Sequence, residues 1–187
     1  WEIEVTGPNR DLHSGHFGGA VANPINTLCS ILAKVIDEDG RITVPHFYDD
    51  VEEVPAAERE MIAQIPFDEK KYMEAIGVKA LKGEKGYSTL ERNSCRPSFD
   101  VCGIWGGYTG EGSKTVLPSK AYAKVSSRLV PHQQHEKISQ LFVDYLTQQA
   151  PDYVQVKVTP LHGGEGYVCP IDHPAYQAAE KGFEKAF

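Results

Sequence analysis

The sequence predicts an α+β fold, a two-layer ferredoxin-like sandwich in which two helices cover one face of a four-stranded antiparallel sheet. Segments that alternate between apolar and polar residues, as half-buried strands do, occur at Trp1–Val5, Ala121–Leu129 and Val154–Val158. Two segments between them repeat apolar residues at helical spacing, and a further core segment begins near Phe99. The resulting order of strand, helix, strand, strand, helix and strand is that of the split βαβ arrangement.

The first helix is expected between the first strand and residue 40. Apolar residues recur there at 3.6-residue spacing, which places them on one face of a helix. These residues are Ile25, Leu28, Cys29, Leu32, Val35 and Ile36. Pro24 suits the first position of a helix and Gly40 suits its end, so we expect the helix to lie between them.

Residues from about 41 to 97 differ from the rest of the chain and are expected to form a helical insertion over the core domain. Two short helical patterns, near Ala56–Ile65 and Asp68–Ile76, carry many charges, and a loop rich in glycine, lysine and glutamate follows them. A second amphipathic core helix is expected after the long strand. Its apolar face consists of Ile138, Leu141, Phe142, Tyr145 and Leu146.

The composition is that of a globular protein with a hydrophobic core. Of the 187 residues, 41% are hydrophobic and 24% are charged, close to globular averages. The formal net charge of −7 argues against a nucleic-acid-binding protein, which needs a basic surface. No apolar run approaches the roughly 20 residues that a membrane-spanning helix requires. We therefore expect a soluble protein with neither nucleic acid nor membrane as a partner.

Four cysteines are scattered along the chain without a C-x-x-C pair. They are Cys29, Cys95, Cys102 and Cys169. In a chain of this size such a pattern is typical of reduced, mostly buried thiols in a reducing compartment. We therefore expect a cytoplasmic location.

A histidine in the turn-rich loop after the first strand is the first candidate for a functional site. His13 lies within the run Asp11–Gly15, where glycine lets the backbone and the ring approach a ligand closely. An imidazole N–H can stabilise an oxyanion. A turn-stabilising surface histidine would give the same pattern, so the loop alone leaves both interpretations open.

Arg128 and His162 are candidates for ligand binding. Arg128 lies on the polar face of a predicted strand, where its guanidinium group would suit bidentate binding of a carboxylate. A solvated surface charge is the alternative. His162 precedes two glycines directly after the last strand, which is typical of a turn or of a hinge that carries a ligand contact.

The sequence lacks two familiar binding motifs. The glycine-rich run Trp105–Thr115 resembles a phosphate-binding loop, but Ser113 stands where that motif requires lysine. None of the seven histidines lies in an H-E-x-x-H pattern or a zinc-finger pattern. His132 and His135 have helical spacing, but Pro131 beside them favours a polar helix cap. We therefore expect no metal site within the chain.

Five runs stand in order along almost the whole chain. They are Arg10–Pro24 (RDLHSGHFGGAVANP), Gly40–Val51 (GRITVPHFYDDV), Gly112–Pro118 (GSKTVLP), Ser126–Pro131 (SSRLVP) and His162–Gly164 (HGG). Together they resemble the M20 metallopeptidase family, and within it the carnosinase-like and related dipeptidases.

The resemblance implies a role for each of four residues. His13 matches the histidine that reaches into the partner subunit's active site and stabilises the tetrahedral oxyanion. Thr115 matches a threonine that contacts substrate, also across the dimer in carnosinase-like members. Arg128 matches the arginine that binds the C-terminal carboxylate of the substrate. His162 matches the histidine of the family's H-G-G segment, near the substrate and the hinge.

The resemblance also implies a domain organisation. In that family a catalytic domain binds two zinc ions through residues on either side of an inserted lid domain, through which the enzyme forms homodimers. Residues 1–164 would be the lid and dimerisation domain, and residues 165–187 would begin the returning catalytic domain. The zinc ligands and the general-base glutamate would then lie outside this chain, so we expect the isolated chain to be inactive. We expect an excised segment, since the chain opens within a strand and closes within a helix.

Two other functions remain open at this stage. The domain could come from an M20 aminoacylase or desuccinylase rather than from a dipeptidase that hydrolyses short peptides. The long insertion and the D-L-H-S-G form of the first motif favour the dipeptidase. A non-catalytic oligomerisation module is the second alternative, and candidate residues in glycine-bordered loops disfavour it because assembly needs apolar surface.

Overall fold

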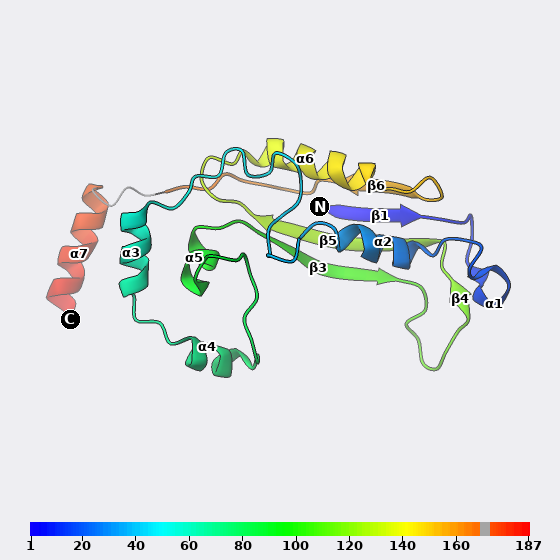
Figure 1. Cartoon of the computed structure of the whole chain (residues 1–187), viewed down its shortest axis with the longest axis horizontal. Helices are drawn as coiled ribbons and strands as arrows, with labels where there is room; N and C mark the ends of the chain where they lie inside the picture. The colour runs from blue at the N-terminus through cyan, green and yellow to red at the C-terminus, as the bar shows by residue number, and fades with distance from the viewer. Residues whose placement is uncertain (169–172) are drawn as a thin grey trace.

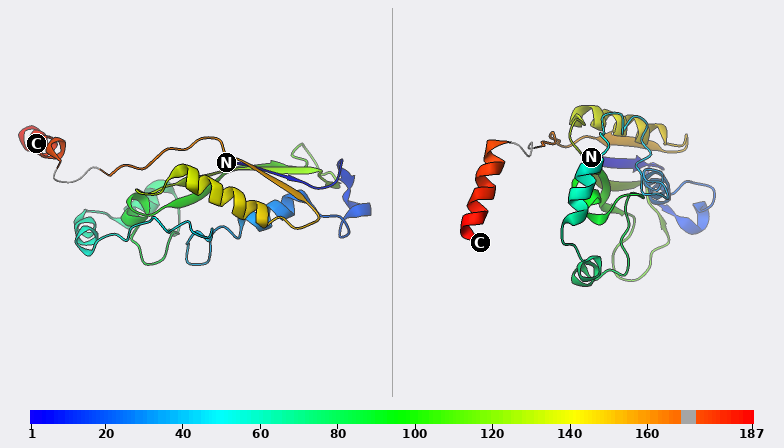
Figure 2. Two further views of the ribbon diagram at one scale, coloured as in Figure 1. Left: turned by 90° about the horizontal axis from the view of Figure 1, so that it is seen from above. Right: turned by 60° about the vertical axis from the view of Figure 1, so that its left-hand side comes forward.

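The computed structural model, described here for residues 1–168 and 173–187, is built around a four-stranded antiparallel sheet (Figure 1). The strands are β1 (Glu2–Thr6), β3 (Ser98–Gly106), β5 (Lys120–Arg128) and β6 (Gln155–Thr159), in the order β3-β5-β1-β6. Helices α2 (Pro24–Leu32) and α6 (His135–Gln148) cover one face of this sheet (Figure 2). The order of elements and of strands is ferredoxin-like. The predicted fold class is confirmed.

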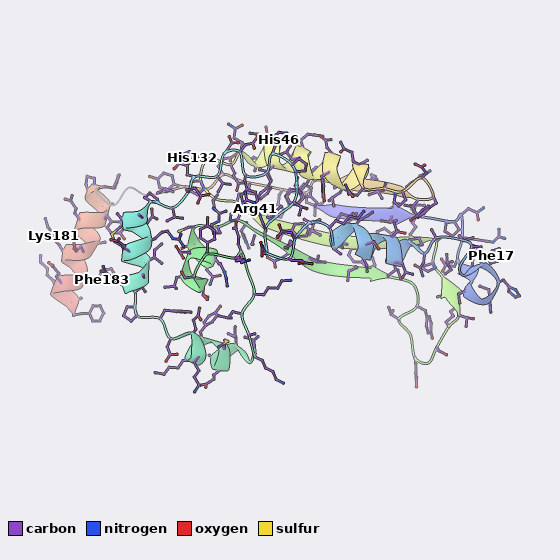
Figure 3. All side chains as sticks on the ribbon, in the orientation of Figure 1. Phe17, Arg41, His46, His132, Lys181 and Phe183 are labelled. Atoms are coloured by element: carbon purple, nitrogen blue, oxygen red, sulfur yellow. The ribbon has the colours of Figure 1, made fainter. Side chains whose placement is uncertain are left out.

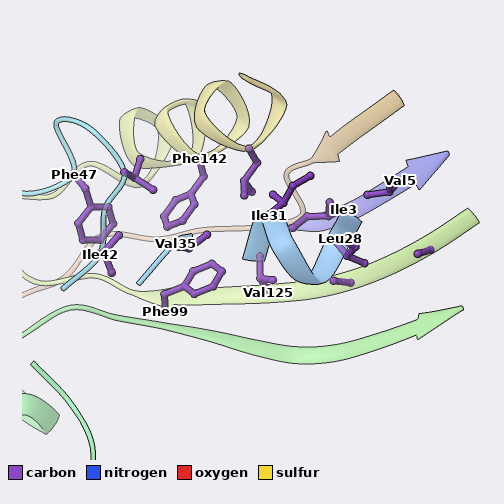
Figure 4. Close-up of a cluster of buried hydrophobic side chains, with 14 of the residues drawn as sticks. Ile3, Val5, Leu28, Ile31, Val35, Ile42, Phe47, Phe99, Val125 and Phe142 are labelled. Carbon is purple, nitrogen blue, oxygen red and sulfur yellow. The ribbon is translucent and has the colours of Figure 1, made fainter. Parts of the chain in front are cut away.

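The core lies between the sheet and the two helices, as Figure 4 shows. Alternation along β1 turns Ile3 and Val5 inward, where both are fully buried. The ring of Phe142, on α6, stacks on that of Phe99 at 5.4 Å and meets the edge of Phe47 at 5.8 Å. These contacts hold the helix layer on the sheet.

Helix α2 is shorter than predicted. It ends at Leu32, and the backbone of Val35 accepts a hydrogen bond from the amide of Thr43 instead of continuing the helix. Ile36 then forms an isolated bridge with Ile42. Gly40 closes this turn with φ of +79°, so it does not cap the helix. Val35 is buried all the same, because the turn carries it into the same core.

The expectation of mostly buried thiols is wrong for the three cysteines that the structure describes. Cys29 is exposed on the side of α2 that faces away from the sheet, and Cys102 is exposed at a bulge in the edge strand β3. Cys95 is half-buried. All three are free thiols, and Cys169 lies outside the described residues.

The segment expected to be an insertion contains both predicted helices. They are α3 (Ala56–Gln64) and α4 (Glu69–Ile76), and a further helix, α5 (Thr89–Ser94), was not predicted. Ser88 and Glu91 begin α5 with a capping box, which the spacing S-x-x-E could have indicated. The first residues of the segment belong to the main core, since Ile42 and Phe47 are buried there.

Two smaller elements complete the description. A two-stranded sheet joins β2 (Leu12–His13) to β4 (Val116–Leu117), and the short helix α1 (Ser14–Phe17) follows β2. The helix expected from Pro174 to Phe187 is present as α7 (Pro174–Ala186), and its side chains are exposed. Among the described residues, no helix combines the length and the apolar character that crossing a membrane requires.

Candidate functional site

His13 and Thr115 lie side by side on the small sheet formed by β2 and β4. Pairing of His13 with Val116 places the side chain of Thr115 next to the imidazole, and Thr115 Oγ1 lies 3.0 Å from His13 Nε2. The other ring nitrogen, Nδ1, accepts a hydrogen bond from the backbone N–H of Gly15 at 3.0 Å. Because Nδ1 is an acceptor, a neutral ring carries its proton on Nε2. The geometry therefore makes Nε2–H the donor, and the Thr115 hydroxyl accepts from it.

The glycine after Ser14 is required by this arrangement. A Cβ atom at Gly15 would lie 2.8 Å from Cε1 and 3.0 Å from Nδ1 of His13. Any other residue would therefore press on the ring that the backbone N–H holds. The exposed ring of His16 lies 4.8 Å from that of His13, between centroids.

Asp11 fastens the same loop to the main sheet. Its Oδ1 accepts hydrogen bonds from both the backbone N–H (2.8 Å) and the hydroxyl (2.9 Å) of Ser119, directly before β5. These two bonds hold the pKa of the Asp11 carboxyl below its usual value. Ser119 in turn accepts from the amide of Gly7, just after β1. The loop that carries His13 is thus anchored to the ends of two central strands.

Arg128 and His162 line a cavity of about 930 Å³ at the other end of β5. The cavity lies between the end of β5, the beginning of α6 and residues 160–166, which follow β6. Both side chains are exposed, and the structure gives Arg128 no ion pair with any described residue. A guanidinium group without a protein partner, on a cavity wall, is free to bind a carboxylate.

The four candidate residues therefore form two pairs at opposite ends of the sheet. Strand β5 separates them: Ser119, bonded to Asp11, precedes Lys120, and Arg128 is the last residue of the strand. Eight residue steps at roughly 3.3 Å each span roughly 26 Å. Figure 3 shows the same separation, with Phe17 of α1 at one end and His132, shortly before α6, at the other. Within one chain the two pairs cannot line one ligand site.

Within residues 1–168 and 173–187, no group of three or more His, Cys, Asp or Glu side chains is arranged to hold a metal ion. His132 and His135 do not share a helical face. His132 lies in the preceding turn with φ of +72°, where its Nε2 is 3.4 Å from a carboxylate oxygen of Glu52. The helix begins at His135, close to Pro131 as expected, but its N-cap is Gln134, so neither histidine is the polar cap that the sequence favoured.

One contact at the cavity could not be predicted from the sequence patterns. Glu165 binds both the backbone N–H and the ring of His135, 30 positions apart in sequence. Nothing local in the sequence indicates such a contact. A smaller cavity of about 410 Å³ lies in the insertion, between α3 and α5, and none of the four candidate residues lines it.

A ferredoxin-like domain with exposed polar side chains at both ends of its sheet is the class that the fold defines. Residues 1–154 match the family model described as the peptidase dimerisation domain of M20 proteins. The chain therefore belongs to this family, and the predicted resemblance is confirmed.

Curated relatives extend the similarity over the whole chain. It is 29% identical over 190 residues to the Cys-Gly metallodipeptidase dug1 of Schizosaccharomyces pombe, covering 100% of this chain and 40% of that protein. It is also 29% identical to the Beta-Ala-His dipeptidase of Homo sapiens, covering 99% of this chain and 37% of the relative. The chain thus spans about two fifths of the length of these relatives.

Solved structures of M20 peptidases have the same fold over almost the whole chain. The di-peptidase Dug1p from Saccharomyces cerevisiae superimposes with a TM-score of 0.81 at 28% identity, covering 98% of this chain and 39% of that one. The M20 family metallo-carboxypeptidase Sso-CP2 from Sulfolobus solfataricus gives 0.81 at 31% identity, covering 98% and 48%. Human carnosine dipeptidase 1 gives 0.80 at 28% identity, covering 100% and 40%.

Proposed function

We propose that this chain is the lid and dimerisation domain of a zinc-dependent M20 dipeptidase, and that it completes the active site of a partner subunit. The separation of its two residue pairs carries the proposal. His13 and Thr115 lie at one end of β5, and Arg128 and His162 at the other. A site that uses all four requires two copies of the domain, and a homodimer supplies them.

Each pair has chemistry suited to its proposed role. The Nε2–H of His13 is a donor fixed by Gly15, suited to the oxyanion that forms when a peptide carbonyl is attacked. Thr115 beside it would contact the same substrate. Arg128 would bind the C-terminal carboxylate, and His162 would contact the substrate from the same cavity.

The metal chemistry belongs to the rest of the proposed enzyme. Two zinc ions there would polarise the scissile carbonyl and activate the attacking water. Residues 1–164 would form the lid, with the insertion at about 41–97, and residues 165–187 would begin the catalytic domain. The chain alone is then expected to be inactive. The metal in the relatives' names supports metal use, whereas the identity of the metal, the peptide substrate and the cytoplasmic location stay predictions.

A heterodimer experiment tests the proposal. In the full-length protein, subunits carrying His13→Ala and subunits carrying Arg128→Ala would be co-expressed with different tags, and the mixed dimer purified. If His13 acts across the dimer, one of the two sites in the mixed dimer keeps both residues. Its dipeptidase activity should then return to about half that of the unmodified dimer. Each variant homodimer is the control and should stay impaired.

If both residues serve the same chain's site, the mixed dimer contains no intact site and stays as impaired as the homodimers. That result would overturn the contribution across the dimer. Aminoacylase activity without dipeptidase activity in the unmodified dimer would instead favour the alternative M20 function. A dimer with no hydrolytic activity would indicate the oligomerisation module.

A further inference from the structure

The segment that carries His162 makes few hydrogen bonds that hold it in place. Residues 160–168 follow β6 and form neither helix nor strand. Among the described residues, the side-chain hydrogen bonds of this segment all come from one residue, Glu165, and the structure gives the segment no backbone–backbone bond. The position of His162 in the cavity therefore depends on contacts made by its neighbours.

Glu165 binds the first residue of α6 at two points. Its carboxylate oxygens lie 3.3 and 3.2 Å from the backbone nitrogen of His135, and Oε1 lies 2.6 Å from the Nδ1 atom of the same residue. The first N–H groups of a helix lack intrahelical partners and attract negative charge, so a carboxylate is well placed there. The bonds from His135 hold the pKa of Glu165 below its usual value.

Two glycines let the segment lie flat against this helix end. A Cβ atom at Gly163 would overlap the His135 ring, at 2.9 Å from Cγ and closer to Cδ2. A Cβ atom at Gly166 would lie 3.3 Å from the backbone nitrogen of Pro131. The hydrogen bonds of Glu165 attach the segment to the start of α6, and the two glycines let its backbone approach the helix closely. His162, three residues before Glu165, lines the same cavity as Arg128.

We propose that His135 and Glu165 are positioning residues, a latch that holds residues 161–166 on the start of α6 so that His162 faces the cavity beside Arg128. The role of His162 in contacting substrate within that cavity depends on the proposed function. The latch itself concerns only the order of the segment, and it can be measured without substrate.

The first measurement is the backbone order of the segment in Glu165→Ala, from ¹⁵N relaxation of the amides of Gly163 and Gly164. We expect their order parameters to fall from about 0.85, typical of rigid backbone, to below about 0.6. Glu165→Gln keeps an acceptor for the His135 amide and should retain most of the order. The matched control is Asp152→Ala, which removes an exposed carboxylate beyond the other end of α6 that neither lines the cavity nor bonds to the segment.

The second measurement is the steady-state kinetics of the same variants in the full-length protein. We expect Glu165→Ala to raise KM on the order of tenfold, comparable to the loss when a hydrogen-bonding partner of a metal-bound histidine is removed, with kcat less affected. Glu165→Gln should restore most of the affinity, and Asp152→Ala, an exposed site outside the cavity, should leave KM unchanged. Arg128→Ala is run alongside to report whether the cavity binds substrate at all.

Each outcome decides the proposal. Loss of order with a raised KM in Glu165→Ala, but in neither control, supports the latch and its positioning role. Retained order in Glu165→Ala overturns the latch. Lost order with an unchanged KM, where Arg128→Ala does raise KM, overturns the positioning of His162. An unchanged KM in Arg128→Ala would reject the proposed function, and the order parameters would still decide the latch.

Discussion

The hydroxyl oxygen of Thr115 lies 3.0 Å from Nε2 of His13, so the threonine accepts the N–H that the histidine would offer to a substrate. Both side chains are exposed, and the contact joins residues 102 positions apart through the pairing of β2 with β4. An oxyanion bound by His13 would have to replace this hydroxyl as the acceptor. The exchange is favourable because a charged acceptor forms a stronger hydrogen bond than a neutral one.

The ring of His13 should be in the Nε2–H form when neutral. The backbone N–H of Gly15 donates to Nδ1, which excludes a proton there. Long-range ¹H–¹⁵N spectra of the histidine rings above pH 8 would identify the protonated nitrogen. Gly15→Ala is the matched variant, since its Cβ would press on the ring and should disturb this preference. A dominant Nδ1–H form in the unmodified protein would contradict the geometry.

In the full-length protein, His13→Ala should lower kcat by about 10²–10³, the usual effect of removing one oxyanion donor. The free energy of unfolding should change little, because the His13 side chain is exposed and its two hydrogen bonds lie at the surface. His16→Ala is the control, since its ring is also exposed and lies 4.8 Å away. Equal losses of kcat in the two variants would argue for a general disturbance of the loop.

Elements whose side chains repeat with a regular period were predictable, and those fixed by single contacts were not. Ile3 and Val5 alternate with polar neighbours, so β1 was clear from the sequence. Val35 is buried in the turn after α2, and it would be buried equally well in a longer helix. The spacing of apolar residues therefore could not show that α2 ends at Leu32. The contact of Glu165 with His135 has no local signal at all.

His13, Arg128 and His162 were identified from residue type and position, and Thr115 through motif resemblance alone. The structure added the arrangement of all four. A motif shows that His13 and Arg128 both occur, but their distance depends on the direction and length of β5 between Ser119 and Arg128. Two-residue strands such as β2 and β4 have no periodicity to detect, so the pairing that joins His13 to Thr115 was also invisible.

The Glu91 carboxylate should make the stability of the domain sensitive to acid. Hydrogen bonds from Arg59 and Ser88 lower its pKa to about 2 from a usual 4.5, and its side chain is almost fully buried. Because the folded-state pKa is depressed, the stabilisation is complete above the unfolded pKa of about 4.5 and is lost as the pH falls toward about 2. Glu91→Gln should reduce the drop in unfolding free energy between these limits, measured by urea titration. Glu58→Gln, at an exposed site on α3, should not.

Gly40 should tolerate substitution far less well than Gly77, although the two have nearly the same φ angle. Their φ angles are +79° and +72°, so alanine at either position carries the strain of a left-handed residue, roughly 1–2 kcal/mol. At Gly77 a Cβ atom meets nothing within 4 Å, whereas at Gly40 it would lie 2.5 Å from the backbone oxygen of Gly83. Gly40→Ala must therefore also displace the insertion from the turn after α2. We expect its loss of unfolding free energy, from urea titration, to exceed that of Gly77→Ala by at least about 1 kcal/mol. Equal losses would show that the insertion moves aside freely and is not packed against Gly40 in solution.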